Sequence, residues 1–305
     1  MALNKIVRNA VIAIGNFDGV HKGHQSIFKL GKKIAKRNKQ KFGVITFAPL
    51  PYEFFQKNKK IIRITLDGLK VDLIKKNNID FVFVCKFNKK FSMISAEDFI
   101  TEIVIKKLNP SHIIVGKNFR FGNQRKGNIA LLRKFGKIYN FKVSDLRLAK
   151  ENKIKISSTR IRLAIEKGNV DLAGRLLGRN WSIREKVIPG RKVGRQLGFR
   201  TANIIIKNNI APKIGVYAVK AKIKNKIYNG VANFGLAPTF SRNKLVLEIN
   251  LFKKIPSFYG QFAEIAFVKR LRNEKSFKNK ILLIRQIKKD ITTAKEILKK
   301  WVKQK

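Results

Sequence analysis

The sequence predicts an α/β domain followed by an all-β domain, and three observations support this fold class. The chain has 305 residues, which is enough for two domains of about 100–200 residues each. Up to residue 180, apolar runs alternate with helical patterns. After residue 180, apolar runs follow one another with no helical pattern between them. We therefore expect one domain over residues 1–180 and a second over residues 181–305.

The first domain is expected to contain a parallel sheet. Its apolar runs are rich in Val, Ile and Phe and nearly continuous, as in strands that are buried on both faces. They cover residues 10–14, 42–47, 81–85, 112–115 and 141–143. Helical patterns cover residues 25–38, 66–76, 96–107 and 129–139, and shorter ones follow near 159–167 and 170–177. This alternation predicts a doubly wound α/β domain.

The second domain is expected to be an antiparallel barrel or sandwich, because turns rich in Gly, Pro and Asn separate its strands. The predicted strands cover residues 201–206, 216–223, 227–232, 245–251 and 263–268. A long helix closes the chain. Apolar residues recur every three or four positions from Phe277 to Trp301, and we expect the resulting apolar face to pack on the barrel.

The chain is strongly basic, with 69 Lys and Arg against 18 Asp and Glu and a net charge of +51. Such a charge suggests nucleic-acid binding. However, the excess is even: residues 181–305 hold 30 basic and 6 acidic residues, and residues 1–180 hold 39 and 12. A nucleic-acid-binding arm or stripe would be lopsided. We expect non-specific polyanion binding from the charge, but no nucleic acid as a functional partner.

Cysteine usage and hydropathy indicate a cytoplasmic protein. Cys85 is the one cysteine of the sequence, so no intrachain disulfide can form. No apolar run approaches the ~18 residues of a membrane span. The apolar stretch near the N-terminus, residues 10–14, is too short for a signal peptide.

A glycine-rich stretch, GNFDGVHKGH at residues 15–24, directly follows the first predicted strand and opens the first predicted helix. In an open α/β sheet, ligands bind at the carboxyl ends of the strands, where a helix N-terminus offers free N–H groups to a phosphate. Gly15, Gly19 and Gly23 allow a tight turn and close approach of the backbone. The stretch therefore predicts a phosphate site.

Two of the three histidines lie in this stretch, as His21 and His24. Imidazoles with this spacing near a helix N-terminus are expected to face one phosphate and to donate hydrogen bonds to its developing charge. The third histidine, His112, begins a buried strand and is expected to be structural.

A second motif, ISSTR at residues 156–160, places hydroxyl groups before a helical stretch. Alone, it suits a helix N-cap. Together with the histidine pair, its hydroxyls and forked arginine suit a triphosphate. A third stretch, VGKNFRFG at residues 115–122, follows another strand and is expected at the same edge of the sheet.

These three stretches resemble the N-terminal FMN adenylyltransferase module of the bifunctional bacterial riboflavin kinase/FMN adenylyltransferases, or FAD synthetases. The resemblance continues into the second domain with LGR at 177–179, GRQLGFRTAN at 194–203, GVAN at 230–233 and PTF at 238–240. The family resemblance implies a Rossmann-like nucleotidyltransferase domain and an antiparallel β-barrel kinase domain with a long C-terminal helix.

For the first module, the resemblance implies that the phosphate of FMN attacks the α-phosphate of ATP and that pyrophosphate leaves. His21 and His24 would stabilise the transferring group, and Mg²⁺ would shield the triphosphate. Ser158, Thr159 and Arg160 would hold the β- and γ-phosphates. The other residues implied in binding ATP are Gly15, Asn16, Phe17, Asp18 and Gly23, and those implied in binding the flavin are Asn118 and Arg120.

For the second module, the resemblance implies transfer of the γ-phosphate of ATP to the 5′-hydroxyl of riboflavin. Glu248 would accept the hydroxyl proton. Thr201 and Asn203 would bind Mg²⁺ and the ATP phosphates. A loop would assist them through Gly190, Gly194, Arg195 and Gly198.

Three functions are compatible with these features. The leading one is a bifunctional enzyme that makes FMN and then FAD. The second keeps only the adenylyltransferase, because Arg200, Asn250 and Lys253 depart from the usual kinase pattern of the family. The third is a polyanion-binding protein.

Overall fold

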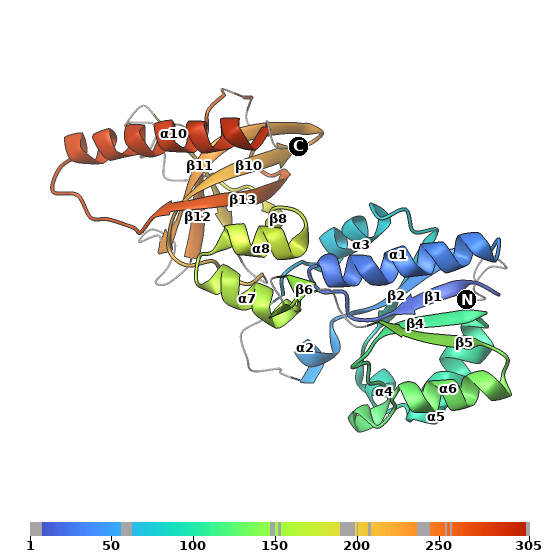
Figure 1. Ribbon diagram of the computed structural model, residues 1–305. Helices are drawn as coiled ribbons and strands as arrows, with labels where there is room; N and C mark the ends of the chain where they lie inside the picture. Colours follow the sequence, from blue (N-terminus) through green and yellow to red (C-terminus); the bar gives the residue numbers. More distant parts are fainter. Residues whose placement is uncertain are drawn as a thin grey trace. The chain divides into compact units, whose positions relative to one another are not determined.

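The computed structural model describes residues 8–55, 63–146, 150–151, 154–189, 199, 201–206, 209–236, 245–253, 255–256 and 258–302. The chain forms two compact units (Figure 1). The first unit comprises Met1–Lys60 and Asp67–Ser157, and the second comprises Ile61–Leu66 and Ser158–Lys305. The predicted α/β plus all-β class is confirmed. The expected division of function at residue 180 stays a prediction.

The first unit is built on a parallel five-stranded sheet in which the strand order is β3-β2-β1-β4-β5. All five predicted strands are present, with bounds that differ by a few residues. Because β1 lies between β2 and β4, the order of the strands reverses at β1, which makes this the switch point of the sheet. The strands are β1 Val11–Ile14, β2 Phe42–Ala48, β3 Phe81–Lys86, β4 His112–Gly116 and β5 Lys142–Leu146.

Helices cover both faces of this sheet. Helices α1 (Lys22–Arg37) and α3 (Asp67–Lys75) pack on the face that carries Val11 and Ala13. The other face, which carries Ile12 and Ile14, packs against α6 (Ile129–Ile138) and against η2 (Phe99–Leu108), the helix before β4. Successive residues of β1 point to opposite faces, and all four are buried, so the strand is apolar throughout.

The helix predicted over residues 96–107 has two parts. It begins as a single turn, α5 (Ala96–Asp98), and continues as a π-helix, η2 (Phe99–Leu108). The sequence pattern did not predict the short elements of this unit, because two to five residues do not establish a period. They are α2 (Pro51–Phe55), α4 (Lys89–Ser92), η3 (Asn123–Arg125), β6 (Lys150–Glu151) and β7 (Ile154–Lys155), alongside the predicted α6 (Ile129–Ile138).

The second unit contains a curled antiparallel sheet in which the strand order is β8-β13-β10-β11-β12-β9. Beyond the end of β8, Ile188 exchanges two backbone hydrogen bonds with Asn203, of 2.9 and 3.2 Å, which brings the two outer strands of the sheet together. The strands are β8 Ser182–Lys186, β9 Thr201–Ile205, β10 Gly215–Ile223, β11 Lys226–Leu236, β12 Leu245–Leu251 and β13 Phe262–Arg272.

Strand β8 was not predicted because Ile183 is the one apolar residue among its five. Its buried Ser182 instead donates a hydrogen bond of 2.9 Å to Glu264 of the neighbouring β13. Arg184 of the same strand lies 3.3 Å from the other oxygen of that carboxylate. Polar cross-strand contacts therefore hold this strand, and such contacts leave no apolar pattern in the sequence.

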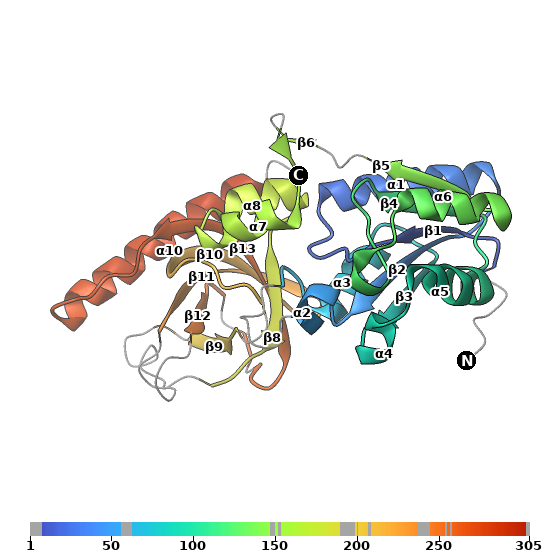
Figure 2. The ribbon, with the colours of Figure 1, turned by 90° about the horizontal axis from the view of Figure 1, so that it is seen from below.

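Helix α10 (Lys280–Val302) runs along β10, β11 and β13 (Figures 1 and 2), as predicted for the closing helix. Its fully buried Ala294 and Leu298 meet Val216, Ala218 and Val231 of the sheet. Helices α7 (Ser158–Glu166) and α8 (Val170–Leu177) pack on each other, and α8 also packs on β13.

An ion pair fixes α10 to the sheet. Arg272, at the end of β13, donates hydrogen bonds of 2.9 and 2.7 Å to the two carboxylate oxygens of Asp290 on α10. The side chains are 17% and 8% exposed, respectively. Gln286 donates a further hydrogen bond of 2.9 Å to the same carboxylate. A shielded bidentate pair of this kind fixes the position of the helix along the sheet.

A short stretch from the first half of the sequence belongs to the second unit. Ile64 and Thr65 are almost completely buried there. The indole N–H of Trp181 donates to the carbonyl of Ile64 at 3.0 Å, and the backbone N–H of Ile210 donates to the carbonyl of Arg63 at 2.8 Å. We call residues 63–66 the strap. The chain therefore leaves the first unit after α2 and returns to it at α3.

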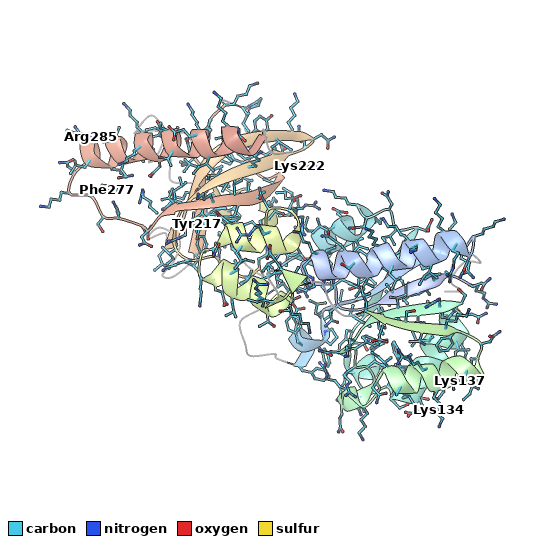
Figure 3. All side chains as sticks on the ribbon, viewed as in Figure 1. Lys134, Lys137, Tyr217, Lys222, Phe277 and Arg285 are labelled. Carbon is cyan, nitrogen blue, oxygen red and sulfur yellow. The ribbon has the colours of Figure 1, made fainter. Side chains whose placement is uncertain are left out.

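Cationic side chains are spread over both units. Lys134 and Lys137 project from α6, and Lys222 and Arg285 lie on β10 and α10 (Figure 3). This distribution agrees with the even split of charge in the sequence. Among the described residues, no helix combines the length and the apolar character needed to cross a membrane.

Removing the Asp290 carboxylate tests how strongly the ion pair holds α10. In Asp290→Ala, the shielded Arg272 guanidinium loses its partner, and we expect the free energy of unfolding of the second unit to fall by about 3 kcal/mol. Urea unfolding followed by circular dichroism measures this change. Glu102→Ala is the control, because Glu102 pairs with Lys106 on an exposed surface, where ion pairs contribute little. Equal losses in the two variants would contradict the prediction.

Candidate active sites

The turn after β1 has an unusual backbone. Phe17, Gly19 and Val20 all have positive φ angles, of 49°, 83° and 43°. For a β-branched residue such as Val20, this left-handed conformation is disfavoured, and strain of this kind costs about 1–3 kcal/mol per residue. Hydrogen bonds compensate for part of it, because Val20 donates to Phe17 at 3.1 Å and accepts from the Gln25 amide at 2.9 Å. Such strain is typical of a functional turn.

The side chain of Phe17 packs against the turn and supports it. Its buried ring lies 3.0 Å from the position that a Cβ atom of Gly15 would occupy, so a side chain at Gly15 would press on the ring. The ring meets His24 edge-on, with 5.2 Å between ring centroids, and packs on Phe28 at 5.0 Å. Phe17 therefore positions both the glycine and the histidine.

The structure brings His21 and His24 together. Their rings stack with centroids 3.5 Å apart and an angle of 18° between planes. His21 is buried and forms the N-cap of α1, since its Nδ1 accepts a hydrogen bond of 3.3 Å from the backbone N–H of His24. Burial, followed by the electrostatic effect of His21, holds the pKa of His24 well below its ordinary value of 6.5. His24 is therefore neutral at pH 7.

A cavity of about 530 Å³ opens at the ends of β1 and β4, where the order of the strands reverses. We call it the switch-point cavity. His24 contributes to its wall, and the buried Nδ1 of this residue has no hydrogen-bond partner within the described part of the chain. The lining residues are Ile14, Gly15, Phe17, His24, Ile27, Gly116, Lys117, Asn118, Phe119 and Lys155. Two of them, Lys117 and Lys155, carry positive charge, which suits an anionic ligand.

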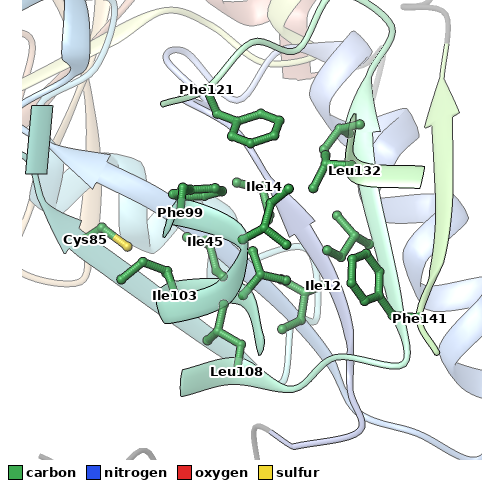
Figure 4. Packing of buried hydrophobic residues seen from close by; sticks show 14 of the residues in the cluster. Ile12, Ile14, Ile45, Cys85, Phe99, Ile103, Leu108, Phe121, Leu132 and Phe141 are labelled. Atoms are coloured by element: carbon green, nitrogen blue, oxygen red, sulfur yellow. The ribbon is translucent and has the colours of Figure 1, made fainter. Parts of the chain in front are cut away.

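A second cavity of the first unit, of about 550 Å³, is mainly aromatic. We call it the aromatic cavity. Phe99 and Phe121, whose ring centroids lie 5.1 Å apart, contribute to its wall and pack against the core around Ile14 (Figure 4). A wall of this kind suits a planar ring system. The aromatic residues that line it are Phe47, Tyr52, Phe55, Phe87, Phe91, Phe99, Phe119 and Phe121, and its polar and charged residues include Asn16, Asn118, Arg120 and Arg125.

The two cavities share a wall. Asn118 and Phe119 line both of them. Gly15 lines the switch-point cavity, and the next residue, Asn16, lines the aromatic cavity. The carbonyl of Asn16 is held by a hydrogen bond of 3.0 Å from the buried hydroxyl of Thr46. Ligands in the two cavities can therefore meet at Asn16 and Asn118.

The remaining predicted residues of the first site lie in two places. Asp18 and Gly23 are buried within the turn and the first turn of α1, and the Tyr52 hydroxyl lies 3.5 Å from an oxygen of Asp18. Ser158 begins α7 in the second unit, with Thr159 and Arg160 in the same first turn. Their predicted contact with a triphosphate stays a prediction.

Polar residues of the second unit gather on one face of its sheet. Glu248 of β12 lies opposite Asn203 of β9 on one side and opposite Asn233 of β11 on the other. Thr201 is two residues before Asn203 and opposite Asn250, so it shares this face. The sheet thus places the predicted base beside both predicted metal ligands.

The carboxylate of Glu248 lies in a polar, partly shielded environment. Although Glu248 is exposed, the surrounding protein removes enough water from its carboxyl group to raise its pKa, and the negative charge of Glu274 adds to this effect. Glu274 accepts a hydrogen bond of 3.3 Å from the Asn233 amide. A raised pKa makes the Glu248 carboxylate a stronger base.

Several predicted kinase residues lie outside the described residues. They are Gly190, Gly194, Arg195 and Gly198 of the predicted phosphate loop, together with Arg200.

Sequence reasoning missed most of the aromatic cavity and the basic residues Lys117 and Lys155. A signal for the aromatic residues was present, because phenylalanines and a tyrosine follow the ends of the second and third predicted strands. No comparable signal distinguishes Lys117 and Lys155 from the many other lysines of the chain.

Comparisons with known proteins identify both halves of the chain. Residues 3–160 match the family model of FAD synthetase, and residues 177–298 match that of riboflavin kinase. Proteins named bifunctional riboflavin kinase/FMN adenylyltransferase are similar over nearly the whole length. The one from Buchnera aphidicola of Acyrthosiphon pisum is 44% identical over 95% of this chain and 93% of its own. The one from Escherichia coli K12 is 34% identical over 94% and 92%.

A crystal structure described as a macrolide-efflux protein of Streptococcus pneumoniae has a similar fold. Its TM-score is 0.82 with 29% sequence identity, over 93% of this chain and 92% of the other. The two family models lie in the order of the two units, and the curated relatives carry both modules in one chain. The chain therefore belongs to the family of bifunctional riboflavin kinase/FMN adenylyltransferases.

Proposed function

We propose that the chain catalyses the two steps of FAD biosynthesis, phosphorylating riboflavin to FMN and then joining FMN to the adenylyl group of ATP. The observation that carries the second step is the wall shared by the switch-point cavity and the aromatic cavity. One cavity is basic and lies at the carboxyl ends of parallel strands, as nucleotide sites do. The other is aromatic and matches the isoalloxazine ring in size and chemistry.

In the adenylyl transfer, ATP occupies the switch-point cavity and FMN the aromatic cavity. A phosphate oxygen of FMN forms a bond to the α-phosphorus of ATP, the bond from that phosphorus to the bridging oxygen breaks, and pyrophosphate leaves. This reaction depends on positioning and on stabilisation of charge. Asn16 and Asn118, which lie where the cavities meet, are placed to orient the two phosphates.

The histidine pair supplies hydrogen bonds to the transferring group. His21 has its Nδ1 engaged at the N-cap, so its other ring nitrogen is the one available as a donor. Neutral His24 donates from one ring nitrogen toward the cavity. Basic residues add favourable charge for the leaving pyrophosphate. They are Lys117 and Lys155 in the cavity wall and, as the resemblance implies, Arg160 of α7, beside which the hydroxyls of Ser158 and Thr159 would bind the β- and γ-phosphates.

In the kinase step, Glu248 accepts the proton of the 5′-hydroxyl of riboflavin as that oxygen attacks the γ-phosphate of ATP. Its raised pKa suits this task. The resemblance assigns the loop with Gly190, Gly194, Arg195 and Gly198 to the nucleotide phosphates. We propose that residues 181–305 carry this step and that residues 1–180 carry the adenylyl transfer.

The residues near Glu248 fit a magnesium ion. Asn203 is 3% exposed, and its buried Oδ1 has no partner among the residues that the structure describes. An amide oxygen and the hydroxyl of Thr201 are hard ligands of the kind that Mg²⁺ accepts. When bound, the ion would neutralise charge on the ATP phosphates.

The other two hypotheses are weaker. The riboflavin kinase model matches through residues 177–298, a stretch that includes Arg200, Asn250 and Lys253, so an adenylyltransferase with a degenerate kinase is not favoured. The even distribution of charge argues against a dedicated polyanion site. Because the sequence has a single cysteine, we propose that the enzyme works in the cytoplasm.

Separate substitutions at the two sites are expected to separate the two activities. His24→Gln removes an imidazole from the switch-point cavity, and we expect FAD formation from FMN to fall by about 100-fold or more. FMN formation from riboflavin should be retained. Glu248→Gln should give the opposite result, with FMN formation reduced by about 100-fold or more. Chromatography of the flavins after incubation with ATP and Mg²⁺ measures both rates.

His112→Gln is a suitable control for these variants. His112 is buried in β4 with its Nε2 2.8 Å from the Ser144 hydroxyl, and it lines neither cavity. We expect this variant to keep both activities once it is folded. Failure of the wild-type protein to make FAD from FMN and ATP would reject the proposed function itself.

ATP binding is expected to raise the pKa of His24. In the free protein, burial and the electrostatic effect of His21 keep His24 neutral, whereas a polyphosphate beside the ring favours its protonated form. Binding near pH 6.5 should therefore take up a proton, and affinity should rise as the pH falls from about 8 to about 6. Isothermal titration calorimetry in two buffers of different ionisation enthalpy measures the uptake.

His24→Gln provides the comparison for this measurement. Protonation of ATP itself and binding at the kinase site are common to both proteins, so the difference between them isolates His24. Equal proton uptake by the wild type and by the variant would show that His24 does not titrate against the nucleotide.

A further inference from the structure

The loop that follows Phe121 is closed on itself. Phe121 and Gly127 exchange two backbone hydrogen bonds, of 3.2 and 2.9 Å. A Cβ atom at Gly127 would lie 2.6 Å from the Phe121 ring, so the closure requires glycine at this position. The five residues between them, 122–126, therefore form a compact loop.

Two consecutive residues of this loop have a left-handed backbone. Gln124 and Arg125 have φ angles of 52° and 59°, and such positions disfavour any side chain. Both residues line the aromatic cavity. The neighbouring Lys126 has an ordinary backbone and does not line it. The conformation of the loop thus places Arg125 in the cavity wall and leaves Lys126 outside it.

The guanidinium of Arg125 is available to a ligand. It makes no hydrogen bond or ion pair with any other residue in the part of the chain that the structure describes. Arg120 is the other charged residue of the aromatic cavity, and no described acidic residue lines it. Two cations without a carboxylate in a mainly aromatic wall indicate a ligand that joins a ring system to an anion.

FMN, the proposed ligand of the aromatic cavity, joins a ring system to an anion in this way. The oxidised isoalloxazine ring is neutral, and the charge of FMN lies on its phosphate. We infer that Arg125, held in the cavity wall by the closed loop, binds the phosphate of FMN and makes the adenylyltransferase site select phosphorylated over unphosphorylated flavins. This inference rests on the proposed assignment of the aromatic cavity to the flavin. Arg125 adds to that site a binding residue that the sequence motifs did not indicate.

Selection for a phosphorylated flavin at this site suits the adenylyl transfer. The nucleophile of adenylyl transfer is a phosphate oxygen, so a flavin without a phosphate would occupy the cavity unproductively. The ring of such a flavin would meet the same aromatic wall and gain the same apolar contacts. A guanidinium directed at the phosphate distinguishes the two ligands, because an arginine binds a phosphate through two parallel hydrogen bonds.

The test uses the full chain and two flavins of different charge. For Arg125→Gln, we expect the KM for FMN in FAD formation to rise by about tenfold. This is a small effect for the loss of a hydrogen bond between charged groups, and we expect a small one because Arg125 is solvent-exposed. Lumiflavin has the ring but no ribityl phosphate, and it cannot be phosphorylated by the kinase site. Its inhibition constant against FMN should remain unchanged.

Two further variants make the result specific. Lys126→Gln removes the same charge from the next residue and should change neither constant. Arg125→Lys keeps the charge without the fork and should recover part of the affinity for FMN. An unchanged KM in Arg125→Gln would overturn the inference. So would a parallel rise in the lumiflavin constant, or an equal effect of Lys126→Gln. A wild-type protein that makes no FAD would instead reject the proposed function.

Discussion

Parallel pairing of β1 with both of its neighbours determines where the two cavities of the first unit lie. Ile14 lies opposite Ile45 of β2, and Ala13 lies opposite Ile114 of β4, so the three strands end at one edge. The pairing continues past the strand, because Gly15 donates to the Ile45 carbonyl at 3.1 Å. The ends of these strands provide the walls that meet at Asn16 and Asn118. A change in register on either side would separate the switch-point cavity from the aromatic cavity.

The strained turn after β1 is held from several sides. Phe17 packs beneath it, His21 caps the helix that follows, and Thr46 fixes the carbonyl of Asn16. The end of β2 is held by a fully buried cation, because Lys70 of α3 donates 2.8 Å to the carbonyl of Phe47 and lies 3.1 Å from Asp67. Buried charge of this kind is costly unless it is satisfied. These polar contacts let the backbone keep a shape that the local sequence alone disfavours.

The sequence predicted the parts of this molecule that depend on local pattern. Continuous apolar runs identified the five strands of the first sheet, and the glycines and paired histidines marked the turn after β1, where the structure stacks the two imidazoles. It did not predict β8, whose position depends on the cross-strand contacts of Ser182. Nor did it predict the aromatic cavity, because Phe47 and Phe121 are far apart in sequence and line the same cavity only when β2 and β4 flank β1. Long-range packing and polar cross-strand contacts leave little trace in local periodicity.

Because of the strap, the second unit of this chain is not formed from one continuous stretch of sequence. The carbonyl of Ile64 receives its hydrogen bond from an indole 117 residues later in the sequence. During synthesis, residues 63–66 leave the ribosome long before Trp181, so their partner does not yet exist. The second unit can complete its folding only by recruiting a segment already tethered at both ends to the first. A protein made by starting translation at residue 158 would therefore lack part of its own interior.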